Sequence, residues 1–132
     1  MDQQLLPKLT LGESRQRILV ADDEVPIRHF CQLGLQRQGL VVDEAVNGSI
    51  ALEACQKHHY DLVLLDVDMP EMNGLDVCRR LRQAPPDPHL KIIMFSGRAS
   101  PDDLALMLMM GADDYLTKSF TLIQLQARVQ AA

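Results

Sequence analysis

Five side chains that could carry out phosphoryl chemistry each follow an apolar run of the chain. They are Asp22 and Asp23 after ILVA, Asp66 after DLVLL, Ser96 after KIIMF and Lys118 after DYLT. If these runs are neighbouring strands of a parallel sheet, the five groups meet at its carboxyl edge, where ligands bind in such sheets. Three carboxylates, a hydroxyl and an ammonium in one crevice suit a divalent cation and a phosphoryl group.

Asp66 is the residue that we expect to react, because a carboxylate can attack phosphorus and become an aspartyl phosphate. The incoming group is itself negative, so positioning and charge neutralisation are most of what the transfer requires. Mg²⁺ is typically held by one or two carboxylates together with phosphate oxygens. We therefore predict Mg²⁺, or Mn²⁺ in its place, on Asp22 or Asp23 with Asp66 and the backbone carbonyl of Asp68.

Lys118 is predicted to offer a positive charge, and Ser96 a hydroxyl donor, to the phosphoryl oxygens. Taken singly, each residue type has a common structural role. An Asp at a strand end often forms a turn or caps a helix, Ser-Gly is an ordinary turn, and a lone Lys is usually a solvated charge. Suitable residues follow four different strands, and this combination favours a role in phosphoryl transfer over separate structural roles.

The elements that must position these residues alternate regularly. Helical patterns separate five apolar strand candidates, at 17–21, 41–45, 61–65, 91–95 and 113–117. This alternation predicts an α/β fold, a doubly wound, five-stranded parallel sheet with helices on both faces and right-handed crossovers. Residues 1–15 are expected to form a flexible lead-in, and residues 16–132 one domain.

The composition is that of an ordinary soluble globular domain, with 47% hydrophobic and 23% charged residues in 132. A net charge of −5 gives no surface for nucleic acid, and no apolar run approaches the roughly 20 residues needed to cross a membrane. No secretion signal is visible. Dispersed Cys31, Cys55 and Cys78 are expected to be buried apolar residues rather than disulfide or zinc ligands, which favours the cytoplasm.

The segments ILVADDE, DLVLLDVDMPEMNGL, IIMFSG and GADDYLTKSF together resemble the receiver domain of two-component response regulators. The resemblance implies a flavodoxin-like strand order of 2-1-3-4-5. It also implies a phosphoacceptor signalling domain that receives its phosphoryl group from a sensor histidine kinase or phosphotransfer protein, without turning over as an enzyme. Asp66 would be the phosphoacceptor, with Asp22 and Asp23 as the acidic pair around Mg²⁺.

The same resemblance assigns the remaining positions and exposes one departure. Ser96 would be the hydroxyl that turns toward the phosphoryl group, Lys118 its cationic partner, and Tyr115 the switch aromatic. The family normally has a cis peptide between Lys and a following Pro, whereas Ser119 follows here. A non-proline cis bond costs about 2.5–4 kcal/mol, so we predict that the Lys118–Ser119 bond is trans, or cis and strained.

Two surface features lead to further expectations. Residues 104–110, LALMLMM, contain no polar residue, although a surface helix normally has a polar outer side. We expect a homodimer or interdomain contact there, on the face that rearranges on phosphorylation in this family. Asp68 and Arg98, two residues beyond Asp66 and Ser96, are expected to form an exposed pair that screens the phosphoryl group.

Two other functions remain open at this point. A receiver that acts only as a docking module, without phosphorylation, fits the departure at Ser119. The sequence DVDMP also matches the Asp-x-Asp motif of haloacid-dehalogenase-type phosphatases, but the Gly-Thr-like turn of that family is missing and the chain has no room for its cap domain. The helical pattern at ARVQAA fits a piece of a longer protein or a stand-alone receiver.

Overall fold

The structure, a computed structural model, describes residues 16–84, 88–97 and 100–132. The predicted lead-in at 1–15 and the predicted partner Arg98 lie outside the described residues.

One parallel sheet forms the centre of the domain, in the order β2-β1-β3-β4-β5. This is the predicted order. The strands are β1 (Arg17–Ala21), β2 (Val41–Ala45), β3 (Leu62–Asp66), β4 (Lys91–Ser96) and β5 (Asp114–Thr117). Every residue of β3 is buried, as expected for a central parallel strand that is covered on both faces.

Small shifts in the predicted strand bounds bring the reactive residues into the sheet. Asp66 and Ser96 are the last residues of their strands, rather than the first residues after them. The ladder extends this far because Val67 N donates to the Phe95 carbonyl at 2.9 Å. The register pairs Asp66 with Phe95, so Asp66 and Ser96 lie at the same edge.

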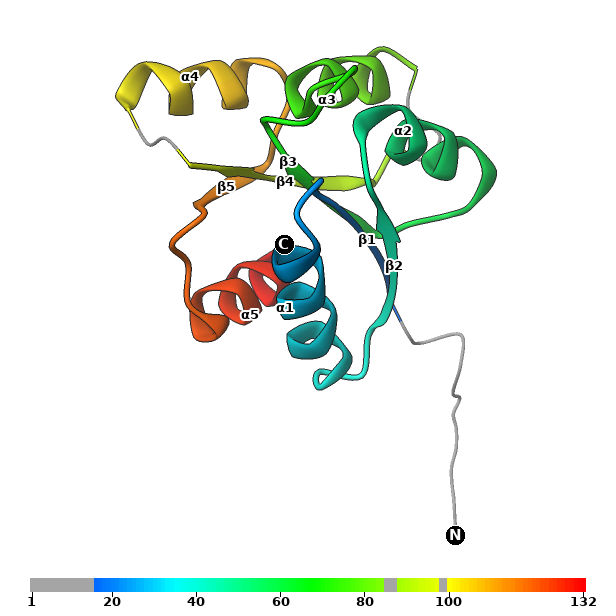
Figure 1. The fold of residues 1–132 in the computed structure, drawn as a ribbon. Helices are drawn as coiled ribbons and strands as arrows, with labels where there is room; N and C mark the ends of the chain where they lie inside the picture. The colour runs from blue at the N-terminus through cyan, green and yellow to red at the C-terminus, as the bar shows by residue number, and fades with distance from the viewer. Residues whose placement is uncertain (1–15, 85–87, 98–99) are drawn as a thin grey trace, which may run out of the picture.

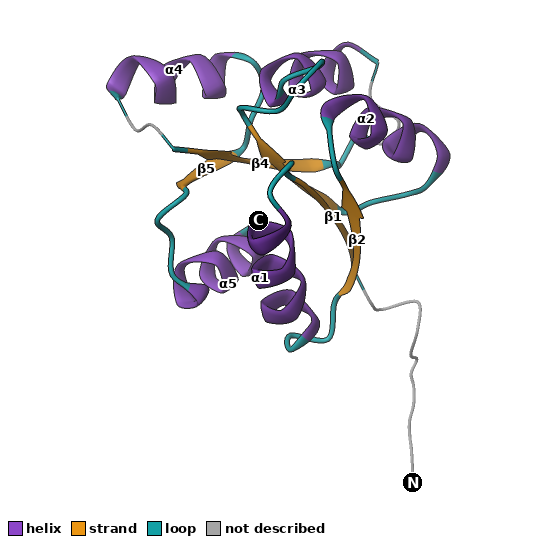
Figure 2. Cartoon of the chain, viewed as in Figure 1, coloured by secondary structure: helices purple, strands orange, loops and turns teal. Residues whose placement is uncertain are grey.

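Five helices cover the sheet, and the two faces are visible in Figures 1 and 2. α1 and α5 lie on one face, while α2, α3 and α4 lie on the other. Their bounds are α1 (Val25–Gln36), α2 (Gly48–Lys57), α3 (Gly74–Gln83), α4 (Pro101–Met109) and α5 (Leu122–Ala131). Ser100 caps α4, because its Oγ accepts from Asp103 N at 3.1 Å.

The core has one hydrophobic layer on each side of the sheet. Cys31, Cys55 and Cys78 are free and buried, as predicted, on α1, α2 and α3 respectively. Burial raises the pKa of the Cys55 thiol to about 12. These cysteines are therefore structural residues with little thiolate character. None of the described helices has the length and apolar character needed to cross a membrane.

Candidate functional site

Three acidic side chains meet at the carboxyl edge of β1 and β3, as the strand pattern predicted. Asp22 directly follows β1 and Asp66 ends β3, and both are fully buried, whereas Asp23 is exposed. One carboxylate oxygen from each of the three lies within 4.8 Å of the other two. This is a spacing at which one cation can contact all three groups.

Lys118 reaches this acidic cluster from the end of β5. Its Nζ lies 3.0 Å from Asp66 Oδ2 and 3.4 Å from Asp22 Oδ2. The peptide bonds of the described residues are all trans, so the prediction for the Lys118–Ser119 bond is confirmed. Ser119 in place of the usual Pro therefore leaves Lys118 within reach of Asp66.

A fourth acid, Glu24, was missed by the sequence reasoning. Its Oε2 accepts a hydrogen bond from Lys118 Nζ at 3.0 Å. Glu24 directly follows Asp22 and Asp23, so the sequence did contain a signal. Because an acidic residue is favourable at the N-terminus of any helix, this position alone did not indicate a role in the site. Lys118 is thus shared between Glu24 and Asp66.

Ser96 and Tyr115 lie on adjacent strands beside the acids. Ser96 is buried, and its main-chain carbonyl accepts from Lys118 N at 2.8 Å, which ties the two predicted phosphoryl contacts together. Tyr115 is partly buried, pairs in register with Met94, and packs against the core. A hollow of about 130 Å³ lies next to Ser96, lined also by Val67, Asp68, Leu75, Asp103, Leu106 and Met107.

The loop that follows β3 folds back over Asp66. Asp68 N donates to Asp66 Oδ1 at 3.1 Å, and Gly74 N donates to the Val67 carbonyl at 3.0 Å. A Cβ at Gly74 would overlap the main-chain carbonyl of Asp66, so only glycine permits this approach. Glu71 takes the left-handed conformation, with φ of 69°. The Asp68 carbonyl remains a predicted metal ligand.

The electrostatics of the site are those of an incompletely neutralised acidic cluster. Burial raises the pKa of Asp66 to about 7; the adjacent Lys118 opposes this rise, and the charge of Asp22 adds to it. Burial also raises the pKa of Asp22, against a hydrogen bond from Glu24 N and the charge of Lys118. Burial lowers the pKa of Lys118, but its hydrogen bond to Glu24 and its ion pair with Asp66 outweigh that effect and raise the pKa overall.

Two buried oxygens point to what would complete the site. Asp22 Oδ2 and Asp66 Oδ2 form no hydrogen bond within the described residues, although Lys118 lies close enough to both for an ion pair. Buried carboxylate oxygens without hydrogen bonds are unfavourable unless they bind a cation. The donor set, all oxygen, fits Mg²⁺ or Mn²⁺.

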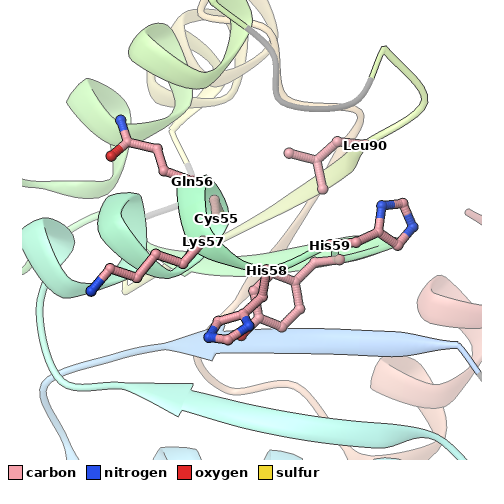
Figure 3. Close-up of a pocket in the computed structure, with 7 residues that line it drawn as sticks. Cys55, Gln56, Lys57, His58, His59 and Leu90 are labelled. Carbon is pink, nitrogen blue, oxygen red and sulfur yellow. The ribbon is translucent and has the colours of Figure 1, made fainter.

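A larger hollow, of about 250 Å³, lies at the opposite edge of the sheet. Figure 3 shows the side chains that line it, which are Cys55, Gln56, Lys57, His58, His59, Tyr60 and Leu90. The rings of His58 and His59 point away from each other (Figure 3). The lining contains no carboxylate and lies before β3 and β4, so it is remote from the acidic cluster.

The predicted apolar surface of α4 is partly exposed. Met109 is 82% exposed, Leu108 50% and Leu106 39%, whereas Met107 is buried against the core. Neighbouring described segments therefore leave three large apolar side chains of 104–110 uncovered.

Comparison with known proteins gives a consistent result. Residues 18–130 match the response regulator receiver domain family. The chain is 42% identical over 125 residues to a protein of Picosynechococcus named "Probable transcriptional regulatory protein", covering 89% of this chain and 49% of that one. It is 36% identical to response regulator ArlR of Staphylococcus aureus, covering 87% and 51%. The chain thus spans about half the length of the curated relatives it matches.

Solved structures share the fold. The chemotaxis response regulator CheY4 of Vibrio cholerae superposes with a TM-score of 0.85 at 29% identity, covering 89% of this chain and 98% of that one. Response regulator TrrA of Thermotoga maritima, solved in complex with Mg²⁺-BeF, superposes with a TM-score of 0.78 at 38% identity, covering 88% and 97%.

Proposed function

Because the chain belongs to the receiver domain family of response regulators, we propose that Asp66 is its phosphoacceptor. The observation that carries this proposal is the meeting of a buried carboxylate, two further acids within 4.8 Å and a lysine ammonium at 3.0 Å. The donor would be the phosphohistidine of a sensor histidine kinase or phosphotransfer protein. An Asp66 carboxylate oxygen attacks phosphorus, the bond from phosphorus to the histidine nitrogen breaks with its electron pair passing to that nitrogen, and the histidine, protonated on its other ring nitrogen, leaves as neutral imidazole.

Asp22, Asp23 and Asp66 would hold the metal, with the Asp68 carbonyl as a further ligand. Mg²⁺ or Mn²⁺, when bound, neutralises the acids and the negative phosphoryl oxygens. Two main-chain N–H groups orient these acids toward the ion. The Glu24 N–H donates to Asp22 Oδ1 at 2.9 Å, and the Asp68 N–H donates to Asp66 Oδ1 at 3.1 Å. Each of these carboxylates then keeps its second oxygen for the ion.

Lys118 would contact a phosphoryl oxygen once Asp66 is modified, since its Nζ already lies 3.0 Å from Asp66 Oδ2. Ser96 would donate its hydroxyl to another oxygen from the neighbouring strand. Tyr115 would change rotamer as Ser96 moves, because both belong to adjacent strands that pair in register. This movement would alter the surface formed by α4, β5 and α5. The exposed apolar side chains of 104–110 would then form a homodimer or an interdomain contact.

Labelling with acetyl phosphate tests this function. Wild type should incorporate one phosphoryl group per chain with Mg²⁺, and none with EDTA or after Asp66→Asn. Asp102→Asn, which removes an exposed acid on α4, should label like wild type.

Two outcomes would contradict the proposal. A wild type that takes no label would behave as a docking receiver that works without phosphorylation. Multiple turnover on an aryl phosphate would identify a phosphatase.

A further inference from the structure

Arg28 is a buried cation that the phosphoryl chemistry leaves unexplained. Four polar or charged residues of the described chain are buried, and the other three, Asp22, Asp66 and Ser96, belong to the candidate site. Arg28 lies on α1, and its guanidinium bonds in two directions. Nη1 donates to the main-chain carbonyl of Asp22 at 2.7 Å, and Nε donates to Glu44 Oε1 at 2.9 Å.

The Asp22 carbonyl needs such a donor because the chain leaves the sheet at this residue. Asp22 N still donates to the Ala45 carbonyl at 3.2 Å, but β1 ends at Ala21. A buried carbonyl beyond the ladder must find a partner elsewhere, and Arg28 supplies it. Asp22 is therefore held at both ends, by Arg28 at its main chain and by the Glu24 N–H at its side chain.

Glu44 makes this arrangement close to neutral. It lies on β2, and it pairs with Arg28 while the two side chains are 24% and 10% exposed. The pair thus connects α1, β2 and the end of β1 without adding net charge to the acidic cluster. The pair therefore affects the position of Asp22 rather than the charge of the cluster. A planar guanidinium holds two acceptors in a fixed relative geometry, whereas an ammonium does not.

We propose that Arg28 is a positioning residue for the metal, acting through the Asp22 main chain to aim the Asp22 carboxylate at the ion. The proposal rests on the proposed function, because it concerns the same metal site. Outer residues that orient a ligand typically change metal affinity by about 10- to 100-fold when they are replaced. A comparable loss is expected when the guanidinium fork is removed.

The test measures Mn²⁺ binding to the whole 132-residue chain by the loss of the free-ion electron paramagnetic resonance signal, without any phosphoryl donor. The variants are Arg28→Lys, which keeps the charge but not the fork, and Arg28→Met. Arg17→Met is the matched control, because Arg17 also pairs with an acid of β2, Asp43, at 2.9 Å, but does so from the first residue of β1, at the end of that strand remote from Asp22. Thermal unfolding of each variant is measured in parallel.

We expect the Mn²⁺ dissociation constant to rise about tenfold or more in both Arg28 variants and to stay within about twofold of wild type in Arg17→Met. Should Arg28→Met fail to fold, Arg28→Lys alone decides. Wild-type affinity in a folded Arg28→Lys, or an equal loss in Arg17→Met, overturns the positioning role. If wild type itself does not bind Mn²⁺, or if Asp22→Asn binds it equally well, the metal site of the proposed function fails and the role of Arg28 fails with it.

Discussion

Asp66, the proposed phosphoacceptor, combines full burial with a position beside a second buried acid, Asp22. Burial makes its ionised form unfavourable, and the single ammonium of Lys118 does not compensate for both carboxylates. The site therefore holds unfavourable charge until a cation binds. This property of individual side chains affects both the pH dependence of stability and the rate of phosphorylation.

The raised pKa of Asp66 makes the stability of the chain depend on pH. The pKa of Asp66 is about 7 in the folded chain and about 3.9 when unfolded. Because the folded pKa is the higher one, Asp66 costs no stability while it is protonated in both states, below pH ~4. The free energy of unfolding then falls as pH rises to ~7 and the buried carboxyl must ionise. In EDTA at pH 7.5, the free energy of unfolding of Asp66→Asn should therefore exceed that of wild type by roughly 4 kcal/mol. The difference should shrink toward pH 4.

Urea unfolding of both proteins across this pH range provides the measurement. Asp68→Asn, which changes an exposed acid two residues away, is the control and should not alter the pH profile. Parallel pH profiles for wild type and Asp66→Asn would contradict the prediction.

Glu24 accepts a hydrogen bond from Lys118 Nζ, so we expect it to compete with the phosphoryl group for this ammonium. Glu24→Gln removes one negative charge from the rim of the site and releases the ammonium. At saturating Mg²⁺, labelling by acetyl phosphate should accelerate roughly two- to fivefold, since an exposed ion pair is worth at most about 1 kcal/mol. Glu53→Gln is the matched control, because Glu53 pairs with Lys57 at 3.0 Å on the outer surface of α2. Labelling of Glu24→Gln at or below the wild-type rate would exclude this competition.

At the scale of elements, the site depends on how closely α3 begins beside β3. Asn73 caps α3 by accepting from Asp76 N at 2.9 Å, and Gly74 then passes against the Asp66 carbonyl. The helix start thereby supports the strand end that carries the phosphoacceptor. A larger residue at 74 would have to displace main chain.

Gly74→Ala should therefore lower the free energy of unfolding by roughly 1–3 kcal/mol, the usual cost of overpacking. Gly97→Ala is the matched control, because a Cβ at Gly97 meets no atom within 4 Å. It should change stability by no more than about 0.5 kcal/mol. Denaturant unfolding compares the two variants. Equal free energies of unfolding would show that the main chain at the β3–α3 contact can move without a loss of stability.

At the scale of the whole molecule, part of the exposed apolar surface lies close to the candidate site. Leu106, Leu108 and Met109 are exposed on α4, and Leu106 lines the same hollow as Ser96. A change at Ser96 can therefore reach this surface over a short distance. The proposed homodimer or interdomain contact would therefore form close to the proposed site of phosphorylation.

We expect the chain to dimerise more strongly with Mg²⁺ and beryllium fluoride, and Met109→Lys to weaken that dimer at least tenfold, a typical effect at a central apolar contact. Sedimentation equilibrium measures both. Leu33→Lys is the control, because Leu33 is 58% exposed on α1, across the sheet from α4. Monomers at high concentration in both states would exclude the homodimer.

Most of the architecture could be predicted from the sequence, and the reason is topological. Parallel strands joined by helices place their carboxyl ends at one edge, so Asp22, Asp66 and Ser96 had to lie close together once the alternation was recognised. The predicted bounds of β1 and β2 agree with the structure, whereas those of β3, β4 and β5 differ by one residue, because ladder bonds such as Val67 N to the Phe95 carbonyl depend on the neighbouring strand.

We could predict the fold class and the candidate site residues from the sequence, and the strand order from family resemblance. The three-dimensional arrangement was needed to show that Lys118 is shared with Glu24, which is 94 residues away along the chain, and that Arg28 is buried against Asp22 and Glu44. Local patterns encode which residues follow a strand. The partner of a long charged side chain depends on how helices and strands are placed, which no local pattern contains.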